Sequence, residues 1–344
     1  MNFCSDNVTG IAPEILTALV EANNGRAMPY GQDELTAQVE PRFAEVFEHD
    51  VTVALVSVGS AANALALAQM VPPHGAIYCH AEAHIHCDEC GAPEFYTHGA
   101  KLLPLAGEHG RIEPGTLQTA IQTAGLGVVH HVQPAALSLT NATEAGTIYT
   151  PAQVDELATI AHQHGLTVHM DGARFANAVV GADCTPAALT WQAGVDVLSF
   201  GATKNGAMAA EAVVFFTPEL AAQWAYRRKR AGHLWSKMRF LAAQWLAYFE
   251  GDLWQRNARH ANTMAQQLAQ GLSSLPGVRL LHPVEANEVF IALPEAMVQV
   301  LEAAGFRFYH WSPGSYRLVM AFDTHPADLE RFLAIANQAH VMND

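Results

Sequence analysis

The sequence predicts an α/β protein, with a large domain built on a mostly parallel seven-stranded sheet and a small C-terminal α+β domain. Between about residues 51 and 216, short apolar or β-branched runs alternate with helical patterns, as in parallel sheets that helices cover on both faces. After residue 216 the pattern changes to long helical stretches and then to shorter strands and helices. With 344 residues, half of them hydrophobic, the chain is long enough for two packed domains.

Each expected element follows from its local pattern. The strands of the large domain are expected at residues 53–58, 76–79, 101–105, 128–132, 167–170, 195–200 and 212–216. Those of the small domain are expected at 278–282, 288–293, 306–311 and 316–321, with helices at 294–304 and 326–339. Another helix is expected to begin at Thr150, because Pro151 suits a first helical position and Gln153 completes a capping box.

These patterns divide the chain into three parts. Residues 1–14 are expected to form an N-terminal segment at the functional site, residues 15–245 the large domain, and residues 246–344 the small C-terminal domain.

Charge and composition exclude several classes of partner. The chain has 18 Lys and Arg against 33 Asp and Glu, and this net charge of −15 argues against nucleic acid or an anionic membrane as the main partner. No apolar run reaches the roughly 18 residues that a membrane span requires. The first 25 residues contain no Lys or Arg, and the five cysteines are too few for a disulfide scaffold. A cytoplasmic location is therefore expected.

Lys204 is the most informative of only four lysines. It directly follows the expected strand 195–200, in a loop that contains Gly201 and Gly206. A lysine at the carboxyl end of such a strand projects into the crevice where open α/β sheets bind ligands. Its amine is then placed to form a Schiff base.

Asp171, together with Lys204, indicates which cofactor the site binds. It ends the expected strand 167–170 and precedes Gly172. Pyridoxal phosphate (PLP) needs a carboxylate beside its ring nitrogen, because a protonated pyridinium is the stronger electron sink. An Asp at one strand end and a Lys at a later one can hold opposite parts of the same ring. The pair therefore predicts a PLP enzyme.

A turn from strand to helix at Gly59, Ser60 and Ala61 predicts the phosphate site. Free backbone N–H groups at a helix start, together with a Ser hydroxyl, form an anion cradle. The turn has neither the Walker pattern nor the GxGxxG spacing of dinucleotide sites.

His84 lies in the most ambiguous segment, residues 83–90. A flat imidazole could stack on the PLP ring and help to move a proton. The alternative is a zinc site built from His84, His86, Cys87 and Cys90, but this cluster lacks a second ligand pair at the usual distance. No metal is expected.

Two arginines suit the carboxylate of an amino-acid substrate, since Arg binds carboxylates in a bidentate manner. Arg174 lies three residues after Asp171, and Arg317 lies in the late strand 316–321.

Together these residues resemble the low-specificity L-threonine aldolases, which include the phenylserine aldolases, over nearly the whole chain. The matching segments are residues 5–10, 30–33, 59–63, 84–85, 169–178, 204–206, 237–239 and Arg317. The resemblance implies the PLP-dependent transferase-like fold (fold type I), a homotetramer or at least a dimer, and cleavage of L-threonine, L-allo-threonine or phenylserine to glycine and an aldehyde.

The resemblance also implies roles for single residues. Lys204 would be the Schiff-base lysine, and His84 would stack on the cofactor ring near Asp171 and Arg174. Substrate contacts would come from Ser5, Tyr30, Arg174 and Arg317. Arg239 would point towards the cofactor phosphate of a neighbouring subunit.

One departure from the family pattern concerns the base. Many members have Glu-Asn-Thr-His-Asn after the middle strand, whose histidine is a candidate for handling the β-hydroxyl. Residues 133–141 contain no histidine here, and His130 and His131 lie earlier. The base is therefore expected to be His84 or a water near the phosphate. Transamination and β-elimination stay open as alternatives, because the cofactor residues are common to them.

Overall fold

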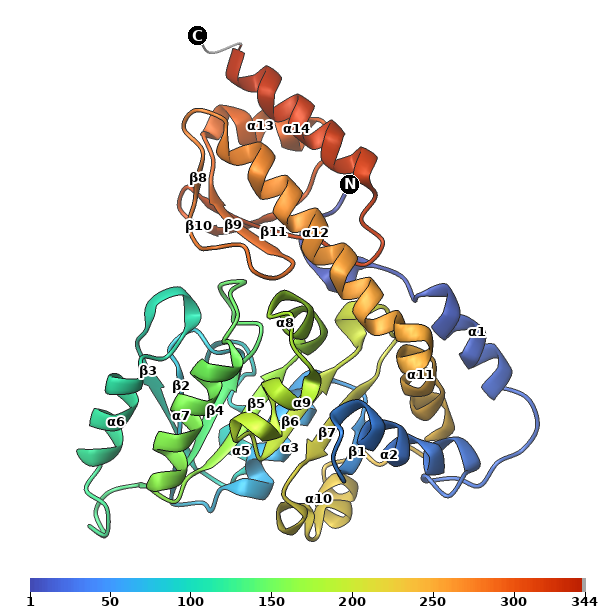
Figure 1. Ribbon diagram of the computed structural model, residues 1–344, viewed down its shortest axis with the longest axis vertical. Coiled ribbons are helices and arrows are strands. Elements are labelled where there is room, and N and C mark those ends of the chain that lie inside the picture. The colour runs from blue at the N-terminus through green and yellow to red at the C-terminus, as the bar shows by residue number, and fades with distance from the viewer. Residues whose placement is uncertain (342–344) are drawn as a thin grey trace.

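The computed structural model describes residues 1–341 and contains two sheets, one in each domain (Figure 1). The large sheet has the strand order β1-β7-β6-β5-β4-β2-β3, and only β7 runs antiparallel to its neighbours among these seven strands. The small sheet has the order β10-β11-β9-β8 and is antiparallel. This arrangement confirms the predicted α/β class and the small α+β domain.

The strands of the large sheet are β1 (Thr52–Val56), β2 (Gly75–His80), β3 (Lys101–Leu105), β4 (Gln133–Thr140), β5 (Thr167–Gly172), β6 (Val197–Gly201) and β7 (Glu211–Phe215). Those of the small sheet are β8 (Arg279–Leu280), β9 (Glu288–Ala292), β10 (Tyr309–Ser312) and β11 (Ser315–Val319). The helices are α1 (Pro13–Ala22), α2 (Glu34–Phe47), α3 (Gly59–Met70), α4 (His84–Cys87), α5 (Ala92–Tyr96), α6 (Pro114–Gln122), α7 (Pro151–Gln163), α8 (Phe175–Gly181), α9 (Pro186–Leu189), α10 (Trp224–Arg230), α11 (Arg239–Phe249), α12 (Leu253–Ser273), α13 (Glu295–Ala303) and α14 (Pro326–Val341). The capping box predicted at Thr150 is present at the start of α7.

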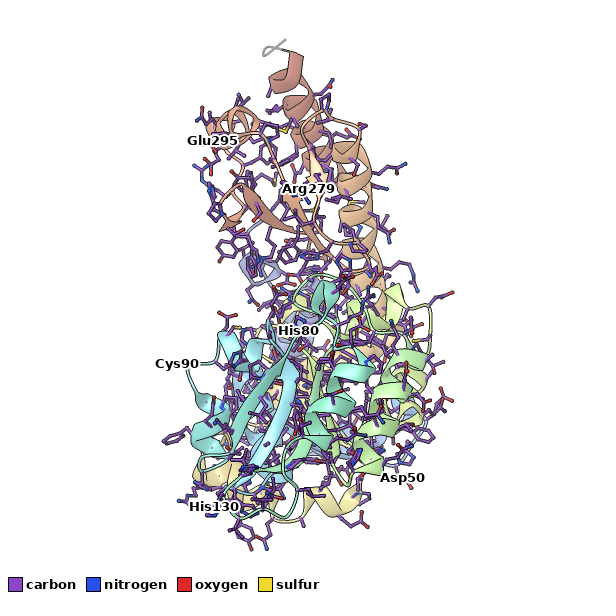
Figure 2. All side chains as sticks on the ribbon, turned by 90° about the vertical axis from the view of Figure 1, so that its left-hand side faces the viewer. Asp50, His80, Cys90, His130, Arg279 and Glu295 are labelled. Atoms are coloured by element: carbon purple, nitrogen blue, oxygen red, sulfur yellow. The ribbon has the colours of Figure 1, made fainter. Side chains whose placement is uncertain are left out.

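The prediction of a strand at residues 128–132 is wrong. This run forms an exposed loop, in which Val129 is 92% exposed, and the neighbouring strand β4 begins only at Gln133. The Gln133 side chain closes the loop, accepting from the N–H of Gly127 and donating to the carbonyl of His131. The β-branched run therefore lies outside the core, and Figure 2 shows His130 at the end of the large domain remote from the small one.

Helices cover both faces of the large sheet, as the continuous apolar strands predict. Helix α3 lies on one face and is itself covered by α5 and α10, so that residues 61–68 are buried without interruption. Helices α2, α7, α8 and α11 pack on the opposite face in one extended core. No helix within residues 1–341 is both long and apolar enough to cross a membrane.

Helix α12 connects the two domains and belongs to both cores (Figure 1). Its first turns, with Leu253 and Trp254, pack in the large core, whereas Leu268 and Leu272 pack in the small one. The N-terminal residues also join the small domain, because the ring of Phe3 lies 5.8 Å from those of both Phe306 and Phe332. The domain limits expected from the sequence stay a prediction.

His169 links three central strands of the large sheet. Its two ring nitrogens lie 2.9 Å from the hydroxyl oxygens of Ser138 on β4 and Ser199 on β6. The ring is fully buried, and this burial lowers the pKa of His169 to about 4. The folded protein therefore keeps His169 neutral.

This buried histidine predicts a specific acid sensitivity. An unfolded histidine titrates near pH 6.5, so below that pH the unfolded state binds a proton that the folded state rejects until about pH 4. The free energy of unfolding should fall by about 2 kcal/mol between pH 7 and pH 5 from this group alone. Urea unfolding of the wild type and a His169→Gln variant at both pH values measures it. If the free energy of unfolding fell equally in both proteins between pH 7 and pH 5, His169 would not be the cause of the acid sensitivity.

Candidate active site

A cavity of about 280 Å³ lies at the edge where the parallel strands of the large sheet end. Because the carboxyl ends of β1, β2, β4, β5 and β6 meet at this edge, the segments that follow them converge there, and antiparallel β7 begins there. The cavity is lined by Asn7, Ser57, Val58, Gly59, Ser60, Asn63, His84, Glu89, Glu144, Asp171, Ala173, Thr203, Lys204 and Glu211.

Lys204 lies in a 3₁₀ turn directly after β6 and is half-buried in this cavity. The next residue anchors the turn, since the amide of Asn205 donates to the hydroxyl of Tyr248 at 2.7 Å and to the carbonyl of Trp254 at 2.8 Å. Gly206 then takes a φ of 111°, which favours glycine. The loop that carries the amine is therefore held against α11 and α12.

Asp171 lies opposite, at the end of β5, and is buried in a polar network. Its Oδ2 accepts from the amide of Asn63 at 2.8 Å, and its Oδ1 accepts from the N–H of Ala173 at 3.0 Å. The same Asn63 amide donates to Glu89, which lies 2.9 Å from Nδ1 of His84. This hydrogen bond to Glu89 raises the pKa of His84, although burial opposes it. Four side chains, from α3, α4, β5 and the segment between α4 and α5, are thus connected on one side of the cavity.

The start of α3 provides the predicted anion cradle. Its N-cap residue, Val58, supplies no side-chain hydrogen bond, and the first intrahelical bond comes only from the N–H of Ala62. Within the described chain, the N–H groups of Gly59, Ser60 and Ala61 have no partner. A helix of this length with free N–H groups suits a phosphate. With Lys204 and Asp171, the residues present fit PLP.

Arg174 and Arg317 lie beside the cavity in a buried charge cluster. The Nε of Arg174 donates to Asp6 at 2.7 Å, and its Nη1 lies 3.3 Å from Glu288. Glu288 also lies 3.7 Å from Nη1 of Arg317, which stacks on the rings of Tyr309 and Trp311. Burial alone would lower the pKa of Arg174, but Asp6 and Glu288 reverse this and raise it.

The N-terminal segment positions this cluster. Ser5 caps the short 3₁₀ helix Asp6–Val8, with its hydroxyl accepting from the N–H of Asn7 at 3.1 Å. Burial would raise the pKa of Asp6, but the nearby charges of Arg174 and Lys204 hold it below its usual range. The predicted contacts of Ser5, Arg174 and Arg317 with a substrate carboxylate stay predictions.

Tyr30 and Arg239 lie outside this cavity. Tyr30 is half exposed beneath Lys229, and its N–H donates to the carbonyl of Ser236. Arg239 lies near the carbonyls of Asn24 and Gly25 in a separate hollow. The two residues are therefore on neighbouring segments, away from their own chain's Lys204.

Three carboxyl groups in the cavity were not singled out from the sequence: Glu89, Glu144 and Glu211. Burial raises the pKa of Glu211 to about 7 and that of Glu144 to about 6. Glu211 begins β7 and accepts a hydrogen bond from the hydroxyl of Thr203, beside Lys204. Glu211 reaches this edge only because β7 runs antiparallel to its neighbours. No local sequence pattern indicates the direction of a strand, so the position of Glu211 could not be predicted.

The zinc hypothesis has no support in the described chain. Cys87 and Cys90 are exposed, and the His84 nitrogen faces Glu89. Among residues 1–341 there is no group of three or more His, Cys, Asp or Glu side chains that could hold a metal ion.

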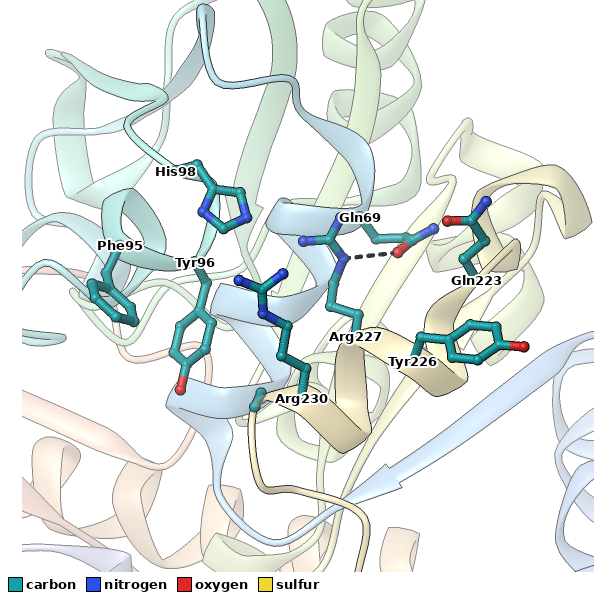
Figure 3. Close-up of a pocket in the computed structure, with 9 residues that line it drawn as sticks. Gln69, Phe95, Tyr96, His98, Gln223, Tyr226, Arg227 and Arg230 are labelled. Atoms are coloured by element: carbon teal, nitrogen blue, oxygen red, sulfur yellow. Dashed lines mark hydrogen bonds between the residues drawn. The ribbon is translucent and has the colours of Figure 1, made fainter.

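A second cavity of about 570 Å³ lies between α5 and α10 (Figure 3). Its lining includes Tyr96, Tyr226 and Arg230, and Arg227 donates to Gln69 at 3.0 Å. Its lining contains no carboxyl or lysine side chain, so it lacks the counterparts of Lys204 and Asp171.

Comparison with known proteins identifies the family of the chain. The beta-eliminating lyase family matches residues 2–296. The low-specificity L-threonine aldolase of Pseudomonas aeruginosa is 43% identical over 99% of this chain and 97% of its own, and that of a Pseudomonas species is 42% identical over 96% of each. A threonine aldolase structure from Leishmania major superposes with a TM-score of 0.92, at 27% identity, over 98% of both chains. The chain therefore belongs to the beta-eliminating lyase family and, within it, to the low-specificity L-threonine aldolases.

Proposed function

We propose that this protein is a PLP-dependent L-threonine aldolase, which cleaves L-threonine, L-allo-threonine or a related β-hydroxy-α-amino acid to glycine and an aldehyde. The carrying observation is one cavity that holds the amine of Lys204, the buried carboxylate of Asp171 and the free N–H groups that begin α3. The relatives named low-specificity L-threonine aldolase support the choice of reaction.

Each residue has a separate task in this proposal. When bound, PLP supplies an electron sink for breaking a bond at Cα. Lys204 would hold the cofactor covalently, Asp171 would neutralise a protonated ring nitrogen, and Gly59 to Ala61 would bind the phosphate. The flat ring of His84 would cover one face. Arg174 and Arg317 would orient the substrate carboxylate, with Ser5 at the same end of the site.

The first prediction tests the cofactor lysine. The purified protein should be yellow, with an absorption band at about 410–430 nm, a wavelength that the surroundings of the cofactor influence. It should also release acetaldehyde from L-threonine. A Lys204→Ala variant should lose both, whereas Lys101→Ala, which removes an exposed lysine, should keep both. A colourless wild type that takes up no PLP would refute the proposal. An aminated product from added 2-oxo acids, without aldehyde, would indicate transamination instead.

The second prediction tests the role of Asp171. An Asp171→Asn variant keeps an acceptor for Asn63 but loses the negative charge, so kcat should fall by about 10²–10³-fold with folding unchanged. Asp183→Asn makes the same change at an exposed position and should leave kcat unaltered. Steady-state kinetics measures kcat of the two variants, and circular dichroism measures whether they are folded. A fully active Asp171→Asn variant would contradict the assigned role.

Charge balance supports an oligomeric active site. The cavity is lined by the carboxyl groups of Glu89, Glu144, Asp171 and Glu211, with Lys204 as the single lysine or arginine in that lining. A phosphate dianion there needs a further cation. Arg239, which lies away from its own cavity, would supply it to a neighbouring chain in a homotetramer, or at least a dimer. Tyr30 lies on the adjoining segment and would enter with it. A cytoplasmic location remains part of the proposal.

The third prediction tests this exchange between chains. Lys204→Ala and Arg239→Ala chains should each be poorly active at limiting PLP. When the two are expressed together, hybrid dimers contain one intact site, so about a quarter of the wild-type activity should return. The control variant is Arg279→Ala, which removes an exposed arginine of the small domain. On its own it should stay active, unlike Arg239→Ala. Co-expressed chains no more active than the separate variants would exclude a shared site.

A further inference from the structure

Glu144 lies on the wall of the cavity, in the turn that follows β4. It shares this cavity with Lys204, Asp171 and His84. It is half-buried, and within residues 1–341 its carboxylate makes no hydrogen bond. An acceptor left free at a reacting centre is available to a ligand.

The turn that carries Glu144 is held from both sides. The N–H of Thr143 donates to the carbonyl of Thr147 at 2.9 Å, and their hydroxyl oxygens lie 2.8 Å apart. Thr147 also donates to the carbonyl of His109 in the large domain. On the other side, the carbonyl of Gly146 accepts from the N–H of Ala286, which leads into the small sheet.

Close packing fixes this turn further. Gly146 has a φ of 72°, and a Cβ there would lie 2.9 Å from the carbonyl oxygen of Glu288. Only glycine therefore allows the turn to approach β9 so closely. A base that acts on a reacting proton must be held in a defined position, and this turn provides such a position.

His84, one of the two bases expected from the sequence, is hydrogen-bonded to another residue. Its Nδ1 lies 2.9 Å from the buried Glu89, and this hydrogen bond raises the pKa of His84 and so favours its charged form. This hydrogen bond occupies Nδ1 of His84. Glu144 has no comparable partner.

The surroundings of Glu144 also shift its pKa in a direction that suits a base. Burial raises its pKa to about 6, with Lys204 opposing and Glu288 adding to this rise, and with Arg174 and Asp171 also near. A carboxyl group with this pKa is ionised at neutral pH yet is a stronger base than an ordinary glutamate.

We propose that Glu144 is the catalytic base that accepts the β-hydroxyl proton of the substrate. This inference rests on the proposed function. The carboxylate of Glu144 takes the proton, and the O–H electron pair becomes the second bond of the aldehyde C=O. The Cα–Cβ bond breaks, its electron pair stays with Cα, and a proton returned to Cα gives glycine. Glycine and aldehyde together contain all the atoms of the substrate.

The experiment separates the β-hydroxyl step from chemistry at Cα. Glycine has no β-hydroxyl, so exchange of its α-proton in D₂O needs the cofactor but not this base. In a Glu144→Gln variant, kcat for L-threonine cleavage should fall by about 10²–10³-fold. Its glycine exchange rate and its affinity for glycine should stay near the wild-type values. Glu144→Asp should keep part of the cleavage activity, and Glu82→Gln, at an exposed position on the neighbouring segment, should keep all of it.

The pH profile gives a second readout. Wild-type cleavage should decline below about pH 6, where Glu144 becomes protonated, and the Glu144→Gln variant should lack this limb. The charged and titratable groups near Glu144 include Lys204, Glu288, Arg174, Asp171, His84 and Cys87. Cleavage by Glu144→Gln at the wild-type rate, or an equal loss of cleavage and glycine exchange, would overturn the inference. A wild type that releases no aldehyde would instead refute the proposed function.

Discussion

Buried charges at the junction of three chain segments determine how the rest of the structure is arranged. Arg174 from the large domain is enclosed by Asp6 from the N-terminal segment and Glu288 from the small domain, which also faces Arg317. Taking such groups out of water is costly, and losing one partner leaves an uncompensated charge that costs about 3–5 kcal/mol. The cluster therefore requires all three segments in place. The next residue after Asp6 and the one before Arg174, Asn7 and Ala173, line the cavity, so the interaction that joins the domains adjoins the candidate site.

Several residues of the site were predictable because their positions follow from topology. Lys204 and Asp171 end neighbouring parallel strands, and the carboxyl ends of such strands meet, so a local reading of each strand brings the two together. Glu144 was not predictable in this way. Whether its side chain faces the cavity depends on a turn fixed by Thr143, Thr147 and a contact with another domain. The same limit explains the wrong strand at 128–132, where β-branched residues satisfied a local pattern without covering the core.

The acidic groups of the cavity differ although they lie close together. Glu144 and Glu211 are raised in pKa by burial, to about 6 and about 7, whereas Asp6 nearby is lowered by Arg174 and Lys204. Near pH 7, Glu211 therefore holds a proton about half of the time, whereas Glu144 is mostly ionised and Asp6 is ionised. Environments that separate the pKa values of like groups are how a site assigns acid and base tasks to them.

The placement of the N-terminal segment has a consequence for biosynthesis. The ring of Phe3 packs against those of Phe306 and Phe332, the N–H of Phe3 donates to the carbonyl of Arg307, and the N–H of Val319 donates to the carbonyl of Phe3. The residues that leave the ribosome first thus acquire their partners only when residues 306–332 have been translated. Asp6 lies three residues later and accepts a hydrogen bond from Asn287, and Glu288 is the second counter-ion of Arg174, so the buried charge cluster is complete only after residue 288 has been made. The charge cluster that joins the domains is therefore one of the last parts of a newly made molecule to form.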